Sequence, residues 1–213
     1  MLDLYTGTPG SGKSLHVARD IYWFMRTGGC VICNFDINRE VFRKRKRKTG
    51  ELKKDYNKGT CLYVPNYMLE PKFLTNYARA FFKRDAKGRI KERQCLLVVD
   101  ECQLIFNARS WNQSGRDLWC SFFTQHRKFG YKIILISQFD RLVDRQIRSL
   151  VENEVKHRKL NNYKFFGQLM GLLYGGSAFI AVTYWYGVKS KIRSETFACK
   201  KRYREFYDSY KIF

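Results

Sequence analysis

The amino-acid sequence predicts an α/β domain with a mainly parallel central sheet flanked by helices. An apolar run at residues 2–6 leads into a glycine-rich loop and then into a helical pattern. A second apolar run, at residues 95–99, ends in two adjacent carboxylates. Other strand-like and helix-like segments alternate along the chain, as they do in parallel sheets whose crossovers contain helices.

The glycine-rich loop is GTPGSGKS, residues 7–14, and it fits the pattern G-x4-G-K-[ST]. In such a loop the glycines let successive backbone N–H groups point at phosphate oxygens. The residues expected to enclose phosphate are Gly7, Thr8, Pro9, Gly10, Ser11, Gly12, Lys13 and Ser14. Lys13 is expected to bridge the β- and γ-phosphates of a nucleotide, and the Ser14 hydroxyl to bind Mg²⁺. The alternative is a glycine turn without a ligand.

The flanks of the loop favour phosphate binding, which needs a buried strand before the loop and a helix after it. The strand is LDLYT, residues 2–6. After the loop, apolar residues recur at helical spacing in KSLHVARDIYWFMRTGG, and Gly28-Gly29 end the pattern. The N-terminus of this helix would add partial positive charge at the loop.

The run CLLVVDE, residues 95–101, predicts the other half of a nucleotide site. An unbroken apolar run is typical of a parallel strand that is buried on both faces. Ligands bind at the C-terminal ends of such strands. Asp100 is therefore expected to bind Mg²⁺ through water, and Glu101 to polarise the water that attacks the γ-phosphate.

The segment YKIILISQ predicts a third strand, at residues 132–137, which ends in the polar pair Ser137-Gln138. A polar side chain at this strand tip can sense the γ-phosphate, and we favour that role for Gln138 over an ordinary strand end. Further strands are expected at residues 31–36 and 61–64, and further helices at residues 73–83 and 117–129.

The charge is strongly positive, with 41 Lys and Arg residues against 19 Asp and Glu residues and a net charge of +22. Such a surface attracts polyanions: nucleic acid, an anionic membrane or an acidic partner. Two basic segments, residues 43–58 and 83–93, are expected to be solvated and to contact DNA phosphates or lipid headgroups. The alternative is an insertion that only keeps the protein soluble.

Seven cysteines are scattered along the chain, and no secretory signal precedes them. This usage predicts reduced thiols in a cytoplasm. Cys30 and Cys33 have the C-x2-C spacing of metal and redox sites. Because they fall in a predicted strand, their sulfurs would lie on opposite faces, which favours small buried apolar residues over a zinc site.

Four segments together resemble the zonular occludens toxin (Zot) family, which includes the assembly ATPases of filamentous bacteriophages. They are GTPGSGKS, VICNFDI, LLVVDECQLIFNARSW and TQHRKFGYKIILISQFDRLVDRQIRSLVE, and the resemblance covers about residues 1–160. It implies the P-loop NTPase fold and a Mg²⁺-dependent ATPase that drives virion assembly and export at the cytoplasmic face of the host inner membrane. The implied partners are phage assembly proteins, that membrane and further copies of the chain in a homo-oligomer. Single-stranded DNA is a further candidate partner, through the basic segments.

The resemblance also implies the site residues. It supports ATP at residues 7–14 and Asp100 with Glu101 as the hydrolytic pair. It further draws attention to Arg109, His126, Arg127, Gln138 and Arg148. One of the arginines is expected to act across a subunit boundary on the leaving phosphate, as arginine fingers do. For each arginine the alternative is a structural salt bridge.

Residues 165–188 carry no charged side chain, and a run of this length permits a membrane helix. Gly175-Gly176 between two apolar halves, and the β-branched and aromatic second half, favour a β-hairpin instead. We therefore expect peripheral attachment to the membrane. The expected organisation is an ATPase core at residues 1–160 and a small C-terminal appendage at residues 161–213, β-rich with some helix.

Two other functions stay open at this point. A nucleotide-switched module would bind ATP, hardly hydrolyse it and recruit a polyanion through its basic segments. A DNA-translocating ATPase outside phage export would move a strand in one direction. Turnover measured with and without DNA tests the first function, and directional translocation by the isolated chain tests the second.

Overall fold

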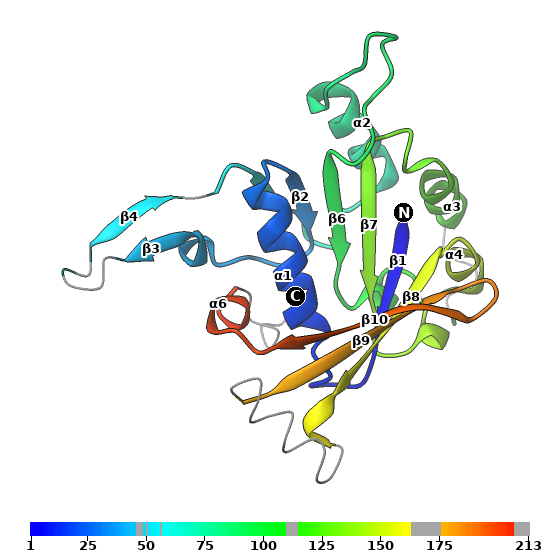
Figure 1. Ribbon diagram of the computed structural model, residues 1–213. Helices are drawn as coiled ribbons and strands as arrows, with labels where there is room; N and C mark the ends of the chain where they lie inside the picture. The colour runs from blue at the N-terminus through cyan, green and yellow to red at the C-terminus, as the bar shows by residue number, and fades with distance from the viewer. Residues whose placement is uncertain (46–48, 50, 56, 110–114, 163–175, 207–213) are drawn as a thin grey trace.

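The computed structural model describes residues 1–45, 49, 51–55, 57–109, 115–162 and 176–206. A large sheet runs through this part of the chain (Figure 1). Its strands are β1 (Leu2–Thr6), β2 (Cys30–Cys33), β5 (Thr60–Tyr63), β6 (Cys95–Val99), β7 (Tyr131–Ile136), β8 (Asn153–Lys159), β9 (Ala178–Trp185) and β10 (Ser190–Ala198). The helices are α1 (Lys13–Arg26), α2 (Pro71–Phe81), α3 (Arg116–Gln125), α4 (Arg145–Ser149) and α6 (Lys201–Arg204).

The strand order in this sheet is β10-β9-β8-β1-β7-β6-β2-β5. The strands from β8 to β5 in that order are parallel to their neighbours, and β9 and β10 continue the sheet in antiparallel pairing. The predicted mainly parallel sheet is therefore confirmed. Because parallel strands end at one edge, the loops that follow them gather there.

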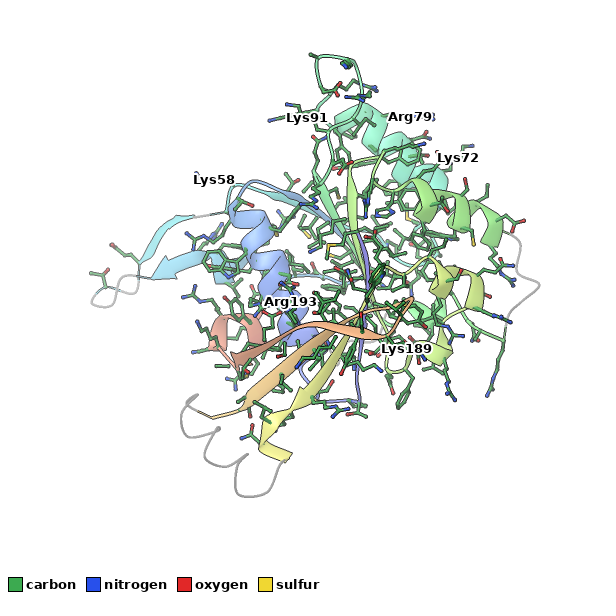
Figure 2. All side chains as sticks on the ribbon, turned by 45° about the vertical axis from the view of Figure 1, so that its right-hand side comes forward. Lys58, Lys72, Arg79, Lys91, Lys189 and Arg193 are labelled. Atoms are coloured by element: carbon green, nitrogen blue, oxygen red, sulfur yellow. The ribbon has the colours of Figure 1, made fainter. Side chains whose placement is uncertain are left out.

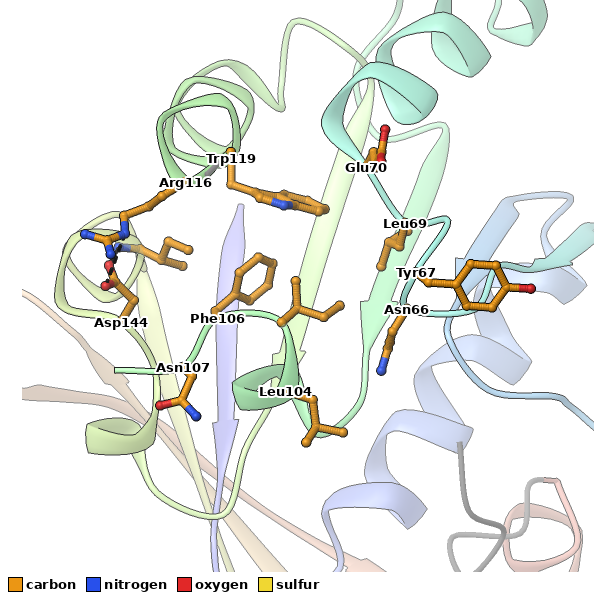
Figure 3. A pocket seen from close by; sticks show the side chains of 13 residues that line it. Asn66, Tyr67, Leu69, Glu70, Leu104, Phe106, Asn107, Arg116, Trp119 and Asp144 are labelled. Carbon is orange, nitrogen blue, oxygen red and sulfur yellow. Dashed lines mark hydrogen bonds and ion pairs between the residues drawn. The ribbon is translucent and has the colours of Figure 1, made fainter. Parts of the chain in front are cut away.

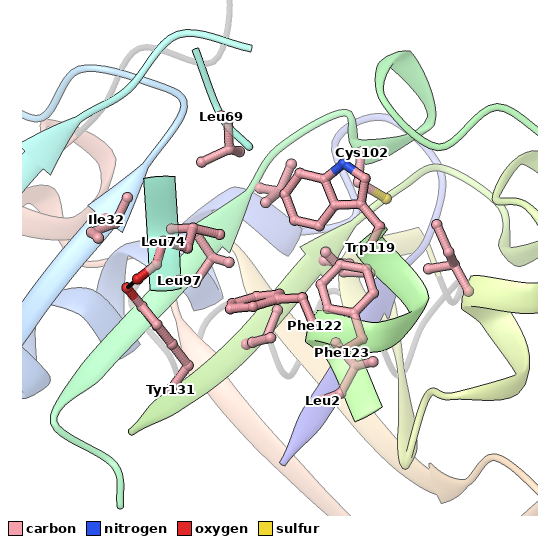
Figure 4. Close-up of a cluster of buried hydrophobic side chains, with 14 of the residues drawn as sticks. Leu2, Ile32, Leu69, Leu74, Leu97, Cys102, Trp119, Phe122, Phe123 and Tyr131 are labelled. Carbon is pink, nitrogen blue, oxygen red and sulfur yellow. Dashed lines mark hydrogen bonds between the residues drawn. The ribbon is translucent and has the colours of Figure 1, made fainter. Parts of the chain in front are cut away.

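Helices cover both faces of the sheet, with α2, α3 and α4 on one face and α1 and α6 on the other (Figure 1). Leu97 of β6 packs in one buried cluster with Leu74 of α2 and Phe122 of α3 (Figure 4). Its neighbour Val98 packs on the opposite face in a second cluster with Ile21 of α1. Burial on both faces explains why β6 needs an unbroken apolar sequence.

The predicted elements correspond to β2, β5, β6, β7, α2 and α3, with boundaries shifted by a few residues. The strand at residues 95–99 has the predicted bounds. Helix α2 begins two residues earlier than expected because Pro71 occupies its first turn, where a missing N–H costs nothing. Helix α3 ends earlier, at Gln125, and the chain turns into β7 through Gly130, whose φ is 78°.

A C-terminal hairpin is present, but its turn is not where the sequence suggested. Strands β9 and β10 pair antiparallel and connect through residues 186–189, whereas the predicted turn was Gly175-Gly176. Residues 165–175, the first half of the predicted hairpin, lie outside the described residues. β9 also pairs with β8, so the hairpin extends the main sheet, and the boundary at residue 160 stays a prediction. No helix within the described residues is long and apolar enough to cross a membrane.

The basic segment at residues 43–58 contains a two-stranded ribbon formed by β3 (Arg43–Arg45) and β4 (Leu52–Asp55). Figure 1 shows this ribbon projecting away from the sheet. Exposed cations also occur elsewhere, including Lys72 and Arg79 on α2 and Lys91 in the loop after it (Figure 2). The positive charge is thus spread over several elements.

The C-x2-C pair lies in β2, as predicted. Cys30 packs against the cluster under α2 and α3, and Cys33 packs in the cluster under α1. The two sulfurs therefore face opposite sides of the sheet. Cys33 Sγ lies 3.7 Å from Cys61 Sγ of the neighbouring strand β5, and both thiols are free.

Candidate phosphate-binding and catalytic site

The register of the sheet brings the two predicted motifs to the same edge. Leu4 of β1 lies opposite Leu135 of β7, and Val99 of β6 lies opposite the same Leu135. The loop after β1 and the Asp100-Glu101 pair after β6 therefore stand two strand spacings apart, or about 10 Å. β7 lies between them and leads into Ser137-Gln138.

The loop after β1 has two positions that only glycine fits. Gly7 has a φ of 145° and Gly12 a φ of 97°. A Cβ at Gly7 would lie 2.6 Å from Ser11 Oγ and 2.7 Å from the carbonyl oxygen of His157. A Cβ at Gly12 would lie 2.6 Å from a ring carbon of Phe179. The backbone is therefore tightly wound and closely surrounded at both ends of the loop.

Ser11, in the middle of this loop, indicates an oxygen-rich ligand. Its hydroxyl oxygen is buried and has no hydrogen-bond partner among the described residues. A buried hydroxyl without a partner costs free energy, so such groups are rare in folded proteins. A phosphate oxygen in the loop would supply the missing acceptor, and the residues present therefore fit a phosphate group.

Lys13 contacts the backbone of the loop and interacts electrostatically with the carboxylates of Asp100 and Glu101. Its Nζ donates hydrogen bonds to the carbonyl oxygens of Gly7 (2.6 Å) and Thr8 (3.3 Å). Burial lowers the pKa of Lys13, while the negative charges of Glu101 and Asp100 raise it. The ammonium and the carboxylate pair therefore belong to one electrostatic site.

Asp100 is buried and held by a neighbouring strand. Its backbone N–H donates to Asn34 Oδ1 (2.7 Å), and Asn34 Nδ2 donates to the Asp100 carbonyl oxygen (2.9 Å). Asn34 was not identified from the sequence, which predicted a strand at residues 31–36 and so placed Asn34 inside it, whereas the observed strand ends at Cys33. The carboxylate of Asp100 and the hydroxyl of Ser14 are oxygen ligands of the kind that Mg²⁺ prefers.

Glu101 is held in an uncommon backbone conformation. Its φ of 44° and ψ of 47° are left-handed, which is rare for a residue other than glycine. Its N–H donates to Asp100 Oδ1 (2.9 Å), and Gln103 Nε2 donates to its carboxylate. Strained backbone of this kind clusters at functional sites, where it fixes a side chain in advance.

Strand β8 forms the floor of the loop, and sequence reasoning did not identify it. Thr6 Oγ1 donates to Glu154 Oε1 (2.8 Å), and His157 Nδ1 donates to the Thr6 carbonyl oxygen (3.2 Å). His157 Nε2 lies 2.8 Å from His16 Nδ1 of α1. Burial, with the neighbouring His16, lowers the pKa of His157 to about 3, so its imidazole is neutral near pH 7.

Gln138 lies beside the loop, because its carbonyl oxygen accepts a hydrogen bond from the Gly7 N–H (3.1 Å). Its side chain is half-buried and has no hydrogen-bond partner among the described residues. Arg109 is exposed, and its backbone N–H donates to Asn107 Oδ1 (2.8 Å). The backbone of Gln138 thus adjoins the loop, whereas Arg109 is exposed.

Arg127 and His126 lie at the opposite edge of the sheet. Arg127 Nη2 is 2.6 Å from Glu152 Oε2, and the amino group of Met1 is 2.6 Å from His126 Nε2. Met1 precedes β1 and the loop follows β1, so about 16 Å of strand separates them. Arg127 therefore forms the structural salt bridge that was the alternative. Its catalytic role stays a prediction.

A cavity of about 510 Å³ lies between α3, α4, the segment that leads into α2 and the segment that follows β6 (Figure 3). Trp119 and Phe106 form its apolar wall, and Arg116 Nε lies 3.5 Å from Asp144 Oδ2 at its side. Its described lining contains none of residues 7–14. Asn66 on its rim accepts a hydrogen bond from Asn34 Nδ2 (2.8 Å), so the cavity adjoins the support of Asp100 rather than the phosphate loop.

A family model described as zonular occludens toxin (Zot) matches residues 1–203 of the chain. The Gene 1 protein of Salmonella phage IKe is 31% identical over 176 residues, which is 80% of this chain and 44% of that protein. The chain spans less than half the length of the curated relatives it matches.

Two solved structures share the fold. The crystal structure of the N-terminal domain of zonular occludens toxin from Neisseria meningitidis has a TM-score of 0.53 and 16% identity, covering 97% of this chain and 98% of that domain. The genome packaging NTPase B204 from Sulfolobus turreted icosahedral virus 2, in complex with ATP-gammaS, has a TM-score of 0.50 and 13% identity. The match covers 92% of this chain and 95% of that chain. These likenesses establish the predicted P-loop NTPase fold.

Proposed function

The chain belongs to the zonular occludens toxin (Zot) family, and on that premise we propose that it is a Mg²⁺-dependent ATPase of filamentous phage assembly. One observation carries the proposal: the register of the sheet brings the Asp100-Glu101 pair to the same edge as Lys13 of the loop. The family supports the cellular role that we propose, in which ATP hydrolysis drives virion assembly and export at the cytoplasmic face of the host inner membrane.

Each residue has a proposed task. The backbone N–H groups of residues 7–14 bind the phosphates, and Lys13 contacts the β- and γ-phosphates. Ser14 and Asp100 would hold Mg²⁺, which when bound neutralises charge on the phosphate oxygens. Glu101 orients the attacking water and accepts its proton. Gln138, beside Gly7, contacts the γ-phosphate.

The assembled form proposed here is a homo-oligomer that works with phage assembly proteins at the membrane. An arginine supplied by a neighbouring copy can stabilise charge on the leaving phosphate, and this is worth a large factor in rate. Arg109 is our first choice because it is exposed and follows the Asp100-Glu101 strand closely in sequence.

The proposal predicts that the purified chain hydrolyses ATP in Mg²⁺ and stops when EDTA removes the metal. We expect the rate of ATP hydrolysis to fall by roughly a hundredfold or more, because the metal balances charge that otherwise builds up on the phosphates. Phosphate release measured before EDTA, after EDTA and after addition of excess Mg²⁺ is the test. Tight ATP binding with almost no turnover, also with single-stranded DNA or anionic vesicles present, would instead favour a nucleotide-switched module.

A second prediction concerns the projecting ribbon of β3 and β4. We expect single-stranded DNA to bind with an affinity that falls with salt, because released counterions drive the contact. Replacing Lys44, Arg45, Lys53 and Lys54 by Gln should flatten the slope of log affinity against log salt by up to about 3, at about 0.7 for each lost phosphate contact. Fluorescence anisotropy at several salt concentrations measures it.

The matched control replaces four cations of the other basic segment, Lys83, Arg84, Lys87 and Arg93, by Gln. An unchanged slope in the ribbon variant, with a reduced slope in this control, would move the DNA contact to the loop after α2. Wild-type protein that shows no slope with DNA but binds vesicles containing anionic lipid would assign the basic segments to the membrane.

A further inference from the structure

A cavity of about 490 Å³ opens directly beside the phosphate loop. One wall is the loop itself with the first turn of α1, from Gly10 to Leu15. The other wall comes from the C-terminal part of the chain and consists of Lys159, Ser177, Phe179, Cys199, Tyr203 and Arg204. The cavity has the size of an ordinary ligand pocket, and polar side chains occur on both of its walls.

The facing wall combines the rings of Phe179 and Tyr203 and the Cys199 thiol with polar side chains. Phe179 of β9 lies against the loop, within 2.6 Å of where a Cβ of Gly12 would be, and it stacks on Phe197 of β10 with ring centroids 5.7 Å apart. Tyr203 of α6 meets Tyr22 of α1 edge-on at 5.7 Å. Both wall rings are thus fixed by neighbours and offer a preformed surface for a flat ligand.

The wall is also tied to the loop through α1. Arg19 of α1 and Glu195 of β10 are joined by a salt bridge with Nη2 and Oε2 3.1 Å apart. The His16 imidazole contacts the same carboxylate at 3.1 Å. Figure 1 shows α6 lying beside α1. Because α1 begins at Lys13, these contacts hold the aromatic wall at a set distance from the phosphate-binding amides.

We infer that Phe179, Cys199 and Tyr203 form the nucleobase subsite of the nucleoside triphosphate whose phosphates lie in the loop. A ligand with phosphate groups and a flat aromatic body fits this lining, because the loop offers phosphate-binding amides with Lys13 and the facing wall offers the rings of Phe179 and Tyr203. The cations of Lys159 and Arg204 in the same lining suit an anionic ligand. This inference rests on the proposed function and adds the C-terminal hairpin to the nucleotide site.

Affinity for ATP compared with inorganic triphosphate tests the subsite, because only ATP has a base. In Cys199→Trp, which fills the pocket, we expect ATP affinity to fall about tenfold or more, the size of one lost stacking contact. Triphosphate affinity should change less than about twofold. The control is Cys120→Trp on α3, where the half-buried Cys120 lies on the other face of the sheet. It should leave the affinities for both ligands unchanged.

A second measurement needs no variant. N-ethylmaleimide alkylates accessible thiols, and peptide mass spectrometry reports the rate at Cys199 and Cys120 separately. ATP should slow alkylation of Cys199 about tenfold at saturation, triphosphate should not, and neither should affect Cys120. Equal protection by triphosphate, no protection by ATP, or equal loss of both ligands in Cys199→Trp would overturn the subsite. If wild-type protein binds neither ligand, it is the phosphate loop, and thus the proposed function, that fails.

Discussion

Lys13→Ala should reduce ATP hydrolysis by about 10²–10³-fold, the effect of removing one preorganised charged donor from a developing negative charge. The ammonium is the one cation in the described loop, residues 7–14, and it donates hydrogen bonds to the carbonyl oxygens of Gly7 and Thr8. No other described side chain from that loop can supply the same charge. Steady-state phosphate release at saturating ATP and Mg²⁺ measures the loss.

The folded state should tolerate this change. Burial lowers the pKa of Lys13, which means that its surroundings disfavour the charge in the absence of phosphate. Thermal unfolding should therefore shift by no more than a few degrees. Lys72→Ala, on the exposed surface of α2, is the matched control and should hydrolyse ATP at the wild-type rate. Full activity in Lys13→Ala would show that the loop does not bind the reacting phosphates.

Some parts of the site could be predicted from the sequence, because the backbone conformation or the burial of a position allows only one type of residue there. Gly7 and Gly12 have a positive φ and no room for a Cβ, so only glycine fits these two positions of the loop. β6 is buried on both faces, so its sequence had to be apolar up to Asp100. Such positions can be recognised from the local sequence, because the residue type does not depend on distant contacts.

Strand β8 escaped prediction for the opposite reason. Its sequence NEVKHRK looks like a solvated segment, yet Glu154 and His157 are buried. Their burial is possible because Thr6 and His16 satisfy their polar atoms. Those partners lie about 150 residues away in the chain, so no local pattern of polarity can indicate them.

The predicted position of the hairpin turn was also wrong. Gly175-Gly176 is a strong turn signal, but the chain reverses at residues 186–189, where Lys189 has a φ of 53°. A lysine in left-handed backbone gives no glycine signal. Arg127 was assigned by resemblance alone, and only the topology shows that it precedes β7 and so lies at the far edge of the sheet.

Glu101→Gln should separate binding from hydrolysis. The amide has nearly the same shape as the carboxylate and keeps an oxygen that can accept the hydrogen bond from Gln103 Nε2. It cannot accept the proton of the attacking water. We therefore expect ATP affinity within about threefold of wild type and hydrolysis reduced by about 10²–10⁴-fold, the usual contribution of a general base. Equilibrium binding of a fluorescent ATP analogue and single-turnover hydrolysis measure the two quantities.

The control is Glu92→Gln, because Glu92 is exposed in the loop after α2. It removes the same charge far from the phosphate edge of the sheet and should leave both quantities unchanged. If Glu101→Gln loses ATP binding as well, the residue supports the loop rather than activating water. If it hydrolyses ATP at the wild-type rate, the base lies elsewhere. The left-handed backbone of Glu101 would then be strain without a catalytic purpose, which natural sequences seldom retain at a strand end beside a phosphate site.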